Sequence, residues 1–232
     1  MEDMNMTEID GREFFCSWSG GKDSSLAYYY TLREGGVPAG LVTTMLESGD
    51  RTRAHGLSRE ILRQQADRLN TDLFTCPTSW DDYEDNFIEL LDELQQKNGE
   101  LELGVFGDID LEGHREWVEK VCGEVGLTAY LPLWEKSRRE LICEFVDTDF
   151  EAIIVALDAE VLSEEYLGRP LDMAFIAELE RLELDPSGEN GEYHTVVVDG
   201  PIFSEPLSYE LGEITSRDGK LFQEIISTAG GS

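Results

Sequence analysis

Basic residues are scarce in this chain of 232 residues. Eighteen lysines and arginines stand against 50 aspartates and glutamates, which gives a formal net charge of −32 at pH 7. A surface with so little positive charge repels nucleic acid, because phosphate binding depends on basic side chains. The composition therefore argues against a nucleic-acid partner.

Long apolar segments and paired cysteines are also missing. No run approaches the roughly 18 consecutive apolar residues that a membrane-spanning helix needs. The first residues, Met1–Met4, carry neither the basic start nor the apolar stretch of a secretion signal. The four cysteines, at positions 16, 76, 122 and 143, include no Cys-x-x-Cys pair. We therefore expect free thiols, no membrane contact and a cytoplasmic protein.

The acidic residues are spread through most of the chain rather than gathered in one tail. At molar salt the Debye length falls to a few ångströms, so that repulsion among these charges is screened. We interpret the composition as an adaptation to very high salt, as in a halophilic archaeon. On this interpretation the net charge says little about the partner.

The most informative stretch is Cys16–Ser25, in which a short apolar run is followed by two glycines and a helical pattern. A strand, a glycine turn and a helix N-terminus form an anion site, because the turn exposes N–H groups and the helix dipole favours negative charge. Lys22 adds a positive charge, and Ser19, Ser24 and Ser25 add hydroxyl donors.

This loop differs from the Walker loop, which needs G-x-x-x-x-G-K-[ST]. Only Gly20 and Gly21 precede the lysine, and Asp23 follows it, so that the shorter loop fits pyrophosphate. The alternative is an ordinary strand-to-helix turn. The sequence Ser-Gly-Gly-Lys-Asp-Ser, placed directly after the first apolar strand, resembles the signature of the PP-loop ATP pyrophosphatases. That resemblance implies cleavage of ATP between its α and β phosphates.

Strand and helix patterns alternate in the first half of the chain. They fall at residues 14–16, 23–32, 40–46, 61–69, 72–75, 81–97, 103–107 and 115–125. Strands joined by helices at this spacing indicate crossover connections in a parallel sheet. We predict an α/β domain with helices on both faces of a parallel sheet over residues 1–128, and a smaller α+β domain over residues 129–232.

Ligands of an open parallel sheet bind at the carboxyl ends of its strands. Met45 and His55 follow the second predicted strand, and Asp108 follows the fourth. His55 is either part of a site, or a solvated side chain or helix cap. Asp108 is either a ligand of Mg²⁺, which prefers one or two carboxylates plus phosphate oxygens, or the N-cap of the next helix.

The second half offers the turn Gly188–Thr195, which places Glu189, Glu192 and His194 directly before an apolar strand. An acidic surface makes extra glutamates common, but this density of functional side chains favours a site. No Ser–His–Asp or Cys–His set is evident. None is needed where a substrate carboxylate attacks the α-phosphate of ATP and the enzyme supplies alignment and charge stabilisation.

Several motifs occur together in a fixed order. They are Ser19–Ser24, Gly107–Ile109, His114–Glu119 with Cys122, Pro132–Trp134, Leu167–Arg169, Glu189–Thr195 and Asp199–Pro201. In this order they resemble the diphthine–ammonia ligase family, which completes diphthamide synthesis. Asn190 stands where the family pattern usually has a second glycine.

The resemblance implies a HUP-type nucleotide-binding domain followed by a small α+β domain. It implies that ATP activates the carboxylate of diphthine on elongation factor 2 as an acyl adenylate, with release of pyrophosphate. Ammonia then displaces AMP and forms the amide. Nothing in the chain resembles a glutaminase, so that free ammonium is the expected nitrogen source.

The resemblance also assigns roles to residues. The catalytic candidates are Lys22, Asp23, Glu189, Glu192 and His194, and Tyr193 and Thr195 would help to shape the diphthine side. The resemblance gives Ser19, Gly20, Gly21, Lys22, Asp23 and Ser24 as nucleotide-binding residues, and the position after predicted strands adds Met45, His55 and Asp108 as candidates. The candidate ligand of Mg²⁺ is Asp108.

Two other functions stay open at this point. A PP-loop enzyme that modifies tRNA would share the ATP chemistry, but the missing Cys-x-x-Cys pair and basic patch count against it. A nucleotide-binding module without turnover, similar to universal stress proteins, would not need an intact Lys22-Asp23-Ser24.

The salt interpretation predicts a specific stability curve. Because screening relieves the repulsion among the acidic side chains, the midpoint of thermal unfolding should rise as potassium chloride is raised into the molar range. Circular dichroism melts across a potassium chloride series measure it. A flat or falling midpoint would contradict the interpretation.

Overall fold

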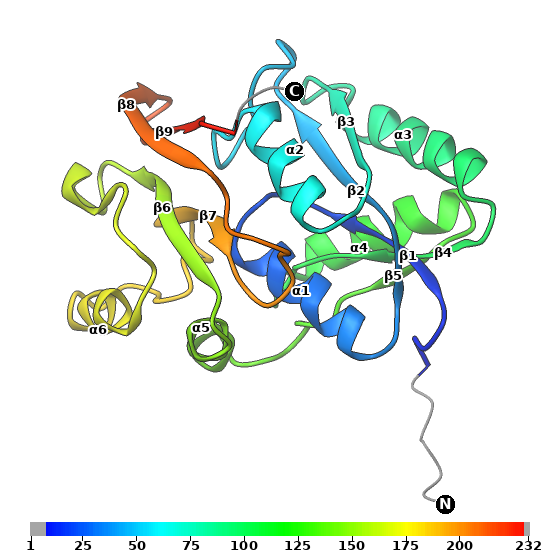
Figure 1. Ribbon diagram of the computed structural model, residues 1–232, viewed down its shortest axis with the longest axis horizontal. Helices are drawn as coiled ribbons and strands as arrows, with labels where there is room; N and C mark the ends of the chain where they lie inside the picture. Colours follow the sequence, from blue (N-terminus) through cyan, green and yellow to red (C-terminus); the bar gives the residue numbers. More distant parts are fainter. Residues whose placement is uncertain (1–7, 230–232) are drawn as a thin grey trace, which may run out of the picture.

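The computed structural model describes residues 8–229 as two β-sheets flanked by helices (Figure 1). Residues 1–7 and 230–232, the outer ends of the two expected domains, lie outside the described residues. Within the described range, no helix is both long enough and apolar enough to cross a membrane.

The first sheet is parallel, and its five strands lie in the order β3-β2-β1-β4-β5. The strands are β1 (Glu13–Ser17), β2 (Val37–Met45), β3 (Leu73–Pro77), β4 (Leu101–Val105) and β5 (Thr128–Tyr130). The connecting helices are α1 (Lys22–Arg33), α2 (Arg59–Arg68), α3 (Tyr83–Lys97) and α4 (Glu112–Glu124). The strand order reverses between β1 and β4, and an open α/β sheet binds its ligands at such a point.

Helices cover both faces of this sheet. Successive residues of a strand point to opposite sides, so that neighbouring residues of β1 pack against different helices. Phe14 and Cys16 of β1 belong to a buried cluster that includes side chains of α1 and α2. Phe15 belongs to a second cluster with side chains of α3 and α4. The central strand is therefore buried on both faces, which is why its sequence is a continuous apolar run.

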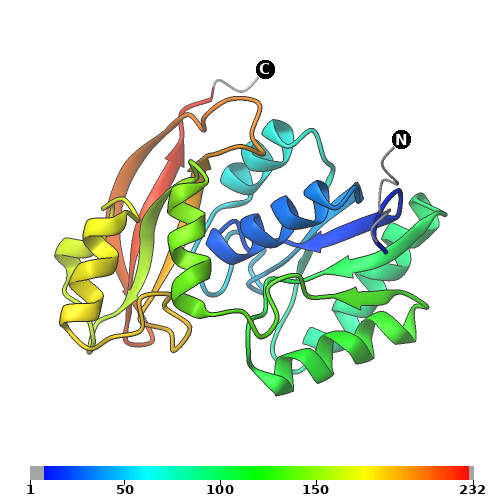
Figure 2. The ribbon, with the colours of Figure 1, turned by 90° about the horizontal axis from the view of Figure 1, so that it is seen from below.

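The second sheet is antiparallel, with the strand order β7-β6-β9-β8. Its strands are β6 (Glu151–Asp158), β7 (Tyr193–Asp199), β8 (Tyr209–Arg217) and β9 (Lys220–Ser227). The helices of this half are α5 (Arg138–Asp147) and α6 (Met173–Arg181), with a short 3₁₀ turn, η1 (Glu164–Tyr166). α5 lies beside α1 in both ribbon views (Figures 1 and 2).

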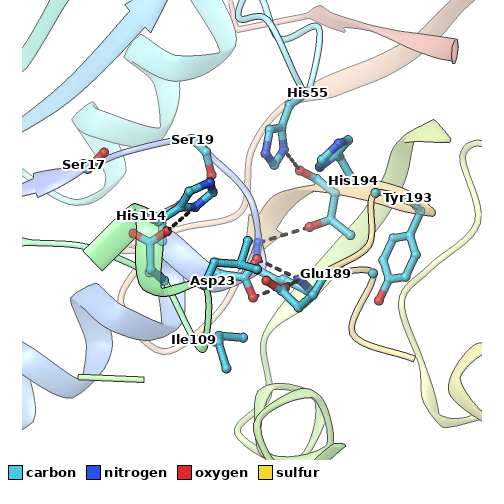
Figure 3. Close-up of a pocket in the computed structure, with 17 residues that line it drawn as sticks. Ser17, Ser19, Asp23, His55, Ile109, His114, Glu189, Tyr193 and His194 are labelled. Carbon is cyan, nitrogen blue, oxygen red and sulfur yellow. Dashed lines mark hydrogen bonds and ion pairs between the residues drawn. The ribbon is translucent and has the colours of Figure 1, made fainter. Parts of the chain in front are cut away.

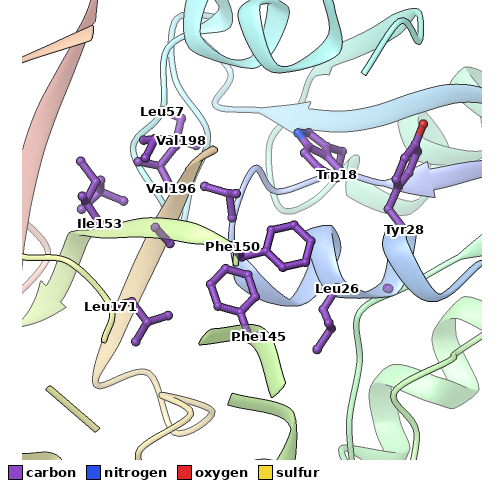
Figure 4. Close-up of a cluster of buried hydrophobic side chains, with 14 of the residues drawn as sticks. Trp18, Leu26, Tyr28, Leu57, Phe145, Phe150, Ile153, Leu171, Val196 and Val198 are labelled. Carbon is purple, nitrogen blue, oxygen red and sulfur yellow. The ribbon is translucent and has the colours of Figure 1, made fainter. Parts of the chain in front are cut away.

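The two sheets share one hydrophobic core (Figure 4). The rings of Phe145 and Phe150 stack with their centroids 4.7 Å apart, and Tyr29 of α1 meets Phe150 edge-on at 5.7 Å. Leu57 from the first half and Val196 of β7 belong to the same cluster. Apolar burial of this kind contributes about 25 cal/mol per Å², so that it holds the second sheet firmly against α1 and α2.

The predicted fold class is confirmed by the parallel α/β sheet and the smaller α+β part. All four cysteines are free, as expected. The sequence pattern does not predict β5, because three residues are too few to show a strand period. β5 lies across the expected division between residues 128 and 129, and that division stays a prediction.

The chain between β1 and α1, residues 18–21, is called the glycine loop. One buried side chain, Gln65 of α2, joins both sheets to this loop. Its amide nitrogen donates to the backbone oxygens of Gly20, at 3.0 Å, and Val197, at 2.8 Å. Its oxygen accepts from the indole N–H of Trp18 at 2.9 Å. The backbone N–H of Val197 also donates to the Gly20 oxygen, at 2.9 Å. The loop is therefore attached to α2 and to β7 at once.

Replacing Gln65 with leucine should destabilise the fold. The variant keeps the approximate size of the side chain but removes the partners of the Trp18 N–H and the Val197 carbonyl. Unpaired buried polar groups cost about 1–3 kcal/mol each, so that we expect the free energy of unfolding in urea to fall by about 2–4 kcal/mol.

The matched control for this variant is Gln96→Leu, on the exposed side of α3. A surface change of this kind should alter the free energy of unfolding by less than about 0.5 kcal/mol. Equal effects in the two variants would contradict the role assigned to Gln65.

Candidate active site

A cavity of about 300 Å³ lies between the glycine loop, the segment that follows β4, and the start of β7 (Figure 3). Its walls combine polar residues from stretches that are far apart in the sequence. They include Ser17, Ser19, Lys22, Asp23, Ser24, His55, Asp108, His114, Glu189, Tyr193, His194 and Thr195. The glycine loop and the turn before β7, which lie far apart in the sequence, therefore face one cavity.

Both loop positions require glycine, for different reasons. Gly20 has a φ of +80°, in the left-handed region that residues with a side chain rarely adopt. At Gly21 a Cβ atom would lie 2.5 Å from Cε1 of His55 and 3.0 Å from the backbone oxygen of Thr195. The backbone N–H of Lys22 donates to Oγ1 of Thr195 at 3.1 Å. The loop and the first residue of α1 are thus packed directly against His55 and β7.

Lys22 is buried, with 7% of its surface exposed, and two carboxylates hold its ammonium group. Nζ lies 2.7 and 2.8 Å from the oxygens of Asp23 and 3.3 Å from Oε1 of Glu189. Burial by itself lowers the pKa of Lys22, but Asp23 and Glu189 together outweigh it and hold the pKa above its ordinary value. A charged lysine therefore joins the loop to the turn.

Glu189 is the carboxyl group whose charge is most finely balanced. Burial, followed by the charge of Asp23, raises the pKa of Glu189 to about 7, while Lys22 opposes the rise. Glu189 can therefore gain or lose a proton close to neutral pH. Three carboxyl groups, Asp23, Asp108 and Glu189, face the cavity against one buried lysine.

Asp108 does not cap a helix, so that the N-cap interpretation is wrong. The N-cap of α4 is Leu111, which makes no side-chain cap bond. Oδ1 of Asp108 instead lies 2.9 Å from Nδ1 of His114. Burial raises the pKa of Asp108, Asp23 adds to the rise, and His114 opposes it.

A metal ion in this cavity would need ligand atoms from a bound molecule as well as from the protein. Among residues 8–229 no group of three or more His, Cys, Asp or Glu side chains is placed to hold one. Mg²⁺ usually takes one or two carboxylates together with phosphate oxygens. The half-buried carboxyl group of Asp108, close enough to Asp23 for the two charges to interact, fits that requirement, and its metal role stays a prediction.

Two histidines line the side of the cavity formed by the second sheet, with ring centroids 4.8 Å apart. Nδ1 of His55 lies 2.7 Å from the backbone oxygen of Thr195, and Nε2 of His194 lies 3.4 Å from Nζ of Lys220. Burial lowers the pKa of both histidines, and the charges of Lys22 and Lys220 lower both pKa values further. His55 does not cap α2, because Ser58 does so.

Met45 and Glu192 do not line the cavity. Met45 is 1% exposed and belongs to the hydrophobic core. The carboxylate of Glu192 turns back onto its own turn and accepts from the backbone N–H and the side-chain amide of Asn190, both at 3.0 Å. The positive φ angles of the turn fall at Gly188 and Gly191, so that asparagine fits at position 190 without strain.

Three residues near the cavity carry no role in the sequence analysis. Ser17 ends β1 and lines the cavity. His114 belongs to a motif, but its contact with Asp108 depends on how the chain turns before α4. Lys220 reaches His194 only because β9 and β7 flank β6 in the antiparallel sheet. No local pattern in the sequence marks that contact.

Comparison with protein families gives two matches that together span most of the chain. The diphthamide synthase N-terminal domain matches residues 14–129, and the diphthamide synthase C-terminal domain matches residues 137–225. The glycine loop lies in the first match and the turn before β7 in the second.

Curated relatives carry a related name. The diphthine–ammonia ligase of Bos taurus is 30% identical over 149 residues, which are 62% of this chain and 55% of that protein. The diphthine–ammonia ligase of Saccharomyces cerevisiae is 30% identical over 181 residues, which are 70% of this chain and 26% of that protein. The chain thus spans about half or less of the length of these relatives.

Among solved structures, a predicted subunit of tRNA methyltransferase from Methanocaldococcus jannaschii aligns with a TM-score of 0.40 and 16% identity. The alignment covers 82% of this chain and 98% of that one. The family is established by the two domain matches, which lie in their expected order along the sequence. This chain belongs to the diphthamide synthase family.

Proposed function

We propose that the protein is an ATP-dependent ligase that amidates the diphthine of elongation factor 2 with ammonium, releasing AMP and pyrophosphate. The observation that carries the proposal is the ion pair between Lys22 and Glu189. This ion pair connects two segments. Lys22 belongs to the motif that resembles the loop of ATP-cleaving enzymes, and Glu189 belongs to the turn before β7, in the second half of the family pattern. The curated relatives, named diphthine–ammonia ligases, support the same activity.

The loop would hold the phosphates of ATP. The N-terminus of α1, the hydroxyl groups of Ser19 and Ser24, and the ammonium group of Lys22 all face the cavity. Such donors stabilise the charge that develops on a departing pyrophosphate. When Lys22 turns to the phosphates, Glu189 loses the cation that opposes the rise in its pKa. Glu189 would then take up a proton, which removes one negative charge from beside the phosphates.

The turn before β7 would present the acyl group. In the first step, a carboxylate oxygen of diphthine forms a bond to the α-phosphorus, and the bond to pyrophosphate breaks. Alignment of the two reactants contributes most where a rigid frame holds both. Here Thr195 bonds to the first residue of α1 and to His55, so that the two sides of the cavity are fixed relative to one another.

Mg²⁺ belongs to this proposal as a partner of ATP. Asp108 would hold it together with phosphate oxygens, and Mg²⁺ would neutralise charge on the phosphates. A cation there would also relieve the repulsion between Asp108 and Asp23, which contributes to the raised pKa of Asp108. We further propose that the protein acts in the cytoplasm, where its free thiols are stable.

One assay tests the proposal. The protein is incubated at high salt with ATP, ammonium and elongation factor 2 that bears diphthine. We expect AMP in an amount equal to the amide formed, and the small mass decrease that conversion of a carboxylic acid to its amide produces. AMP that forms only with tRNA, or no AMP with any acceptor, would contradict it.

Two variants show whether any activity comes from this cavity. Lys22→Ala should lower AMP formation at least about 100-fold, because the loop loses its only charged donor. Lys97→Ala, at an exposed position of α3 far from the cavity, should leave AMP formation unchanged. Circular dichroism establishes that both variants are folded.

A further inference from the structure

One lone pair in the cavity is left without a partner, on Nε2 of His55. The backbone oxygen of Thr195 can only accept a hydrogen bond, so that the 2.7 Å contact fixes the proton on Nδ1. Nε2 of the neutral ring is therefore an acceptor. Within residues 8–229 it makes no hydrogen bond, although the ring lines the cavity.

The other basic groups of the cavity are already engaged. Asp23 and Glu189 bind the ammonium group of Lys22. The remaining two are also paired, Asp108 with His114, and His194 through Nε2 with Lys220. Of the two imidazoles in the cavity, His55 is thus the one whose Nε2 lone pair is free to take a proton.

The position of His55 places this lone pair between the two sides of the cavity. Its ring lies so close to Gly21 that a Cβ atom there would be 2.5 Å from Cε1. At the same edge Nδ1 contacts the backbone oxygen of Thr195, and the ring lies next to His194. Figure 3 shows His55 reaching into the space between Ser19 and His194. A group at Nε2 is therefore near both the glycine loop and the turn.

We propose that His55 is the base that converts ammonium into ammonia inside this cavity, a role that rests on the proposed function. Ammonium has no lone pair and cannot attack a carbonyl carbon until it loses a proton. The cavity attracts the cation, because the carboxyl groups of Asp23 and Asp108 face it.

The amide forms when ammonia attacks the acyl adenylate. One N–H bond of ammonium breaks, its proton passes to Nε2 of His55, and the freed lone pair forms a bond to the acyl carbon of the adenylate. The bond from that carbon to the phosphate oxygen then breaks, and its electron pair leaves with AMP. The new nitrogen loses a second proton to water, which leaves a neutral amide, and His55 returns its proton to solvent.

The charges around His55 suit this role. Burial lowers the pKa of His55, and Lys22 and Lys220 lower it further, so that the ring is neutral and its Nε2 lone pair is available. The backbone oxygen of Thr195 and the carboxylate of Asp23 oppose that effect and stabilise the imidazolium once it forms. His194, beside it, is itself held neutral by burial and adds no repelling charge.

The variant His55→Asn separates this role from a structural one. The asparagine amide nitrogen takes the place of Nδ1 and can still donate to Thr195, but no group remains at the position of Nε2. We expect exchange of labelled pyrophosphate into ATP, which needs only the diphthine-bearing factor, to stay within about threefold of wild type. Amide formation with ammonium at pH 7 should fall at least about 100-fold.

Hydroxylamine supplies the decisive comparison, because it is uncharged at neutral pH and needs no base before it attacks. We expect the variant to use hydroxylamine within about tenfold of the wild-type rate. Its KM for total ammonium should fall about tenfold per pH unit between about pH 7 and 9, as free ammonia becomes available, while the wild-type KM changes little.

Several results would overturn the proposal. Equal losses with ammonium and hydroxylamine would give His55 another role, and so would loss of pyrophosphate exchange in folded His55→Asn. If that variant does not fold, His55→Gln is measured instead; its amide reaches the position of Nε2 but has no basic lone pair, so that the same selective loss with ammonium is expected. Wild-type protein that forms no amide with either nucleophile would overturn the proposed function itself, and the role of His55 with it.

Discussion

The contact between the glycine loop and β7 is the constraint on which the rest of the site depends. The backbones of Gly20 and Val197 bond directly, and the side chain of Thr195 accepts from the first residue of α1. Gln65 of α2 donates hydrogen bonds to both residues of this backbone contact, Gly20 and Val197. A loop that is short and glycine-rich is flexible by itself. Attached in this way, it has one conformation, and the cavity has fixed walls.

The same constraint explains the unusual charges of the cavity. Because the loop and the turn are held together, Lys22 is buried between Asp23 and Glu189 and cannot leave them for solvent. Glu189 consequently titrates close to neutral pH, and two neighbouring histidines stay uncharged. The cavity can therefore receive an anion at the loop and a cation beside the carboxyl groups without a large rearrangement. A reaction that joins ATP, a carboxylate and ammonium needs both.

Local patterns in the sequence predicted the parallel sheet and the glycine loop, because a strand followed by Ser-Gly-Gly-Lys-Asp-Ser is a contiguous signal. They also drew attention to Glu189 and His194 without showing that Glu189 meets Lys22 or that His194 lies beside His55. The carboxylate of Glu192 accepts hydrogen bonds from Asn190 of its own turn, and the catalytic role expected of Glu192 stays a prediction. Gln65 and Lys220 could not be found in advance, because their contacts depend on how α2 and the antiparallel sheet pack.

In the proposed reaction the diphthine carboxylate itself attacks ATP in a cavity shared by the loop and the turn. The decisive measurement labels that carboxylate with heavy oxygen and follows the label through a single turnover with ammonium. If an acyl adenylate forms, one labelled oxygen must leave with AMP. Label in inorganic phosphate, or AMP without label, would contradict the account.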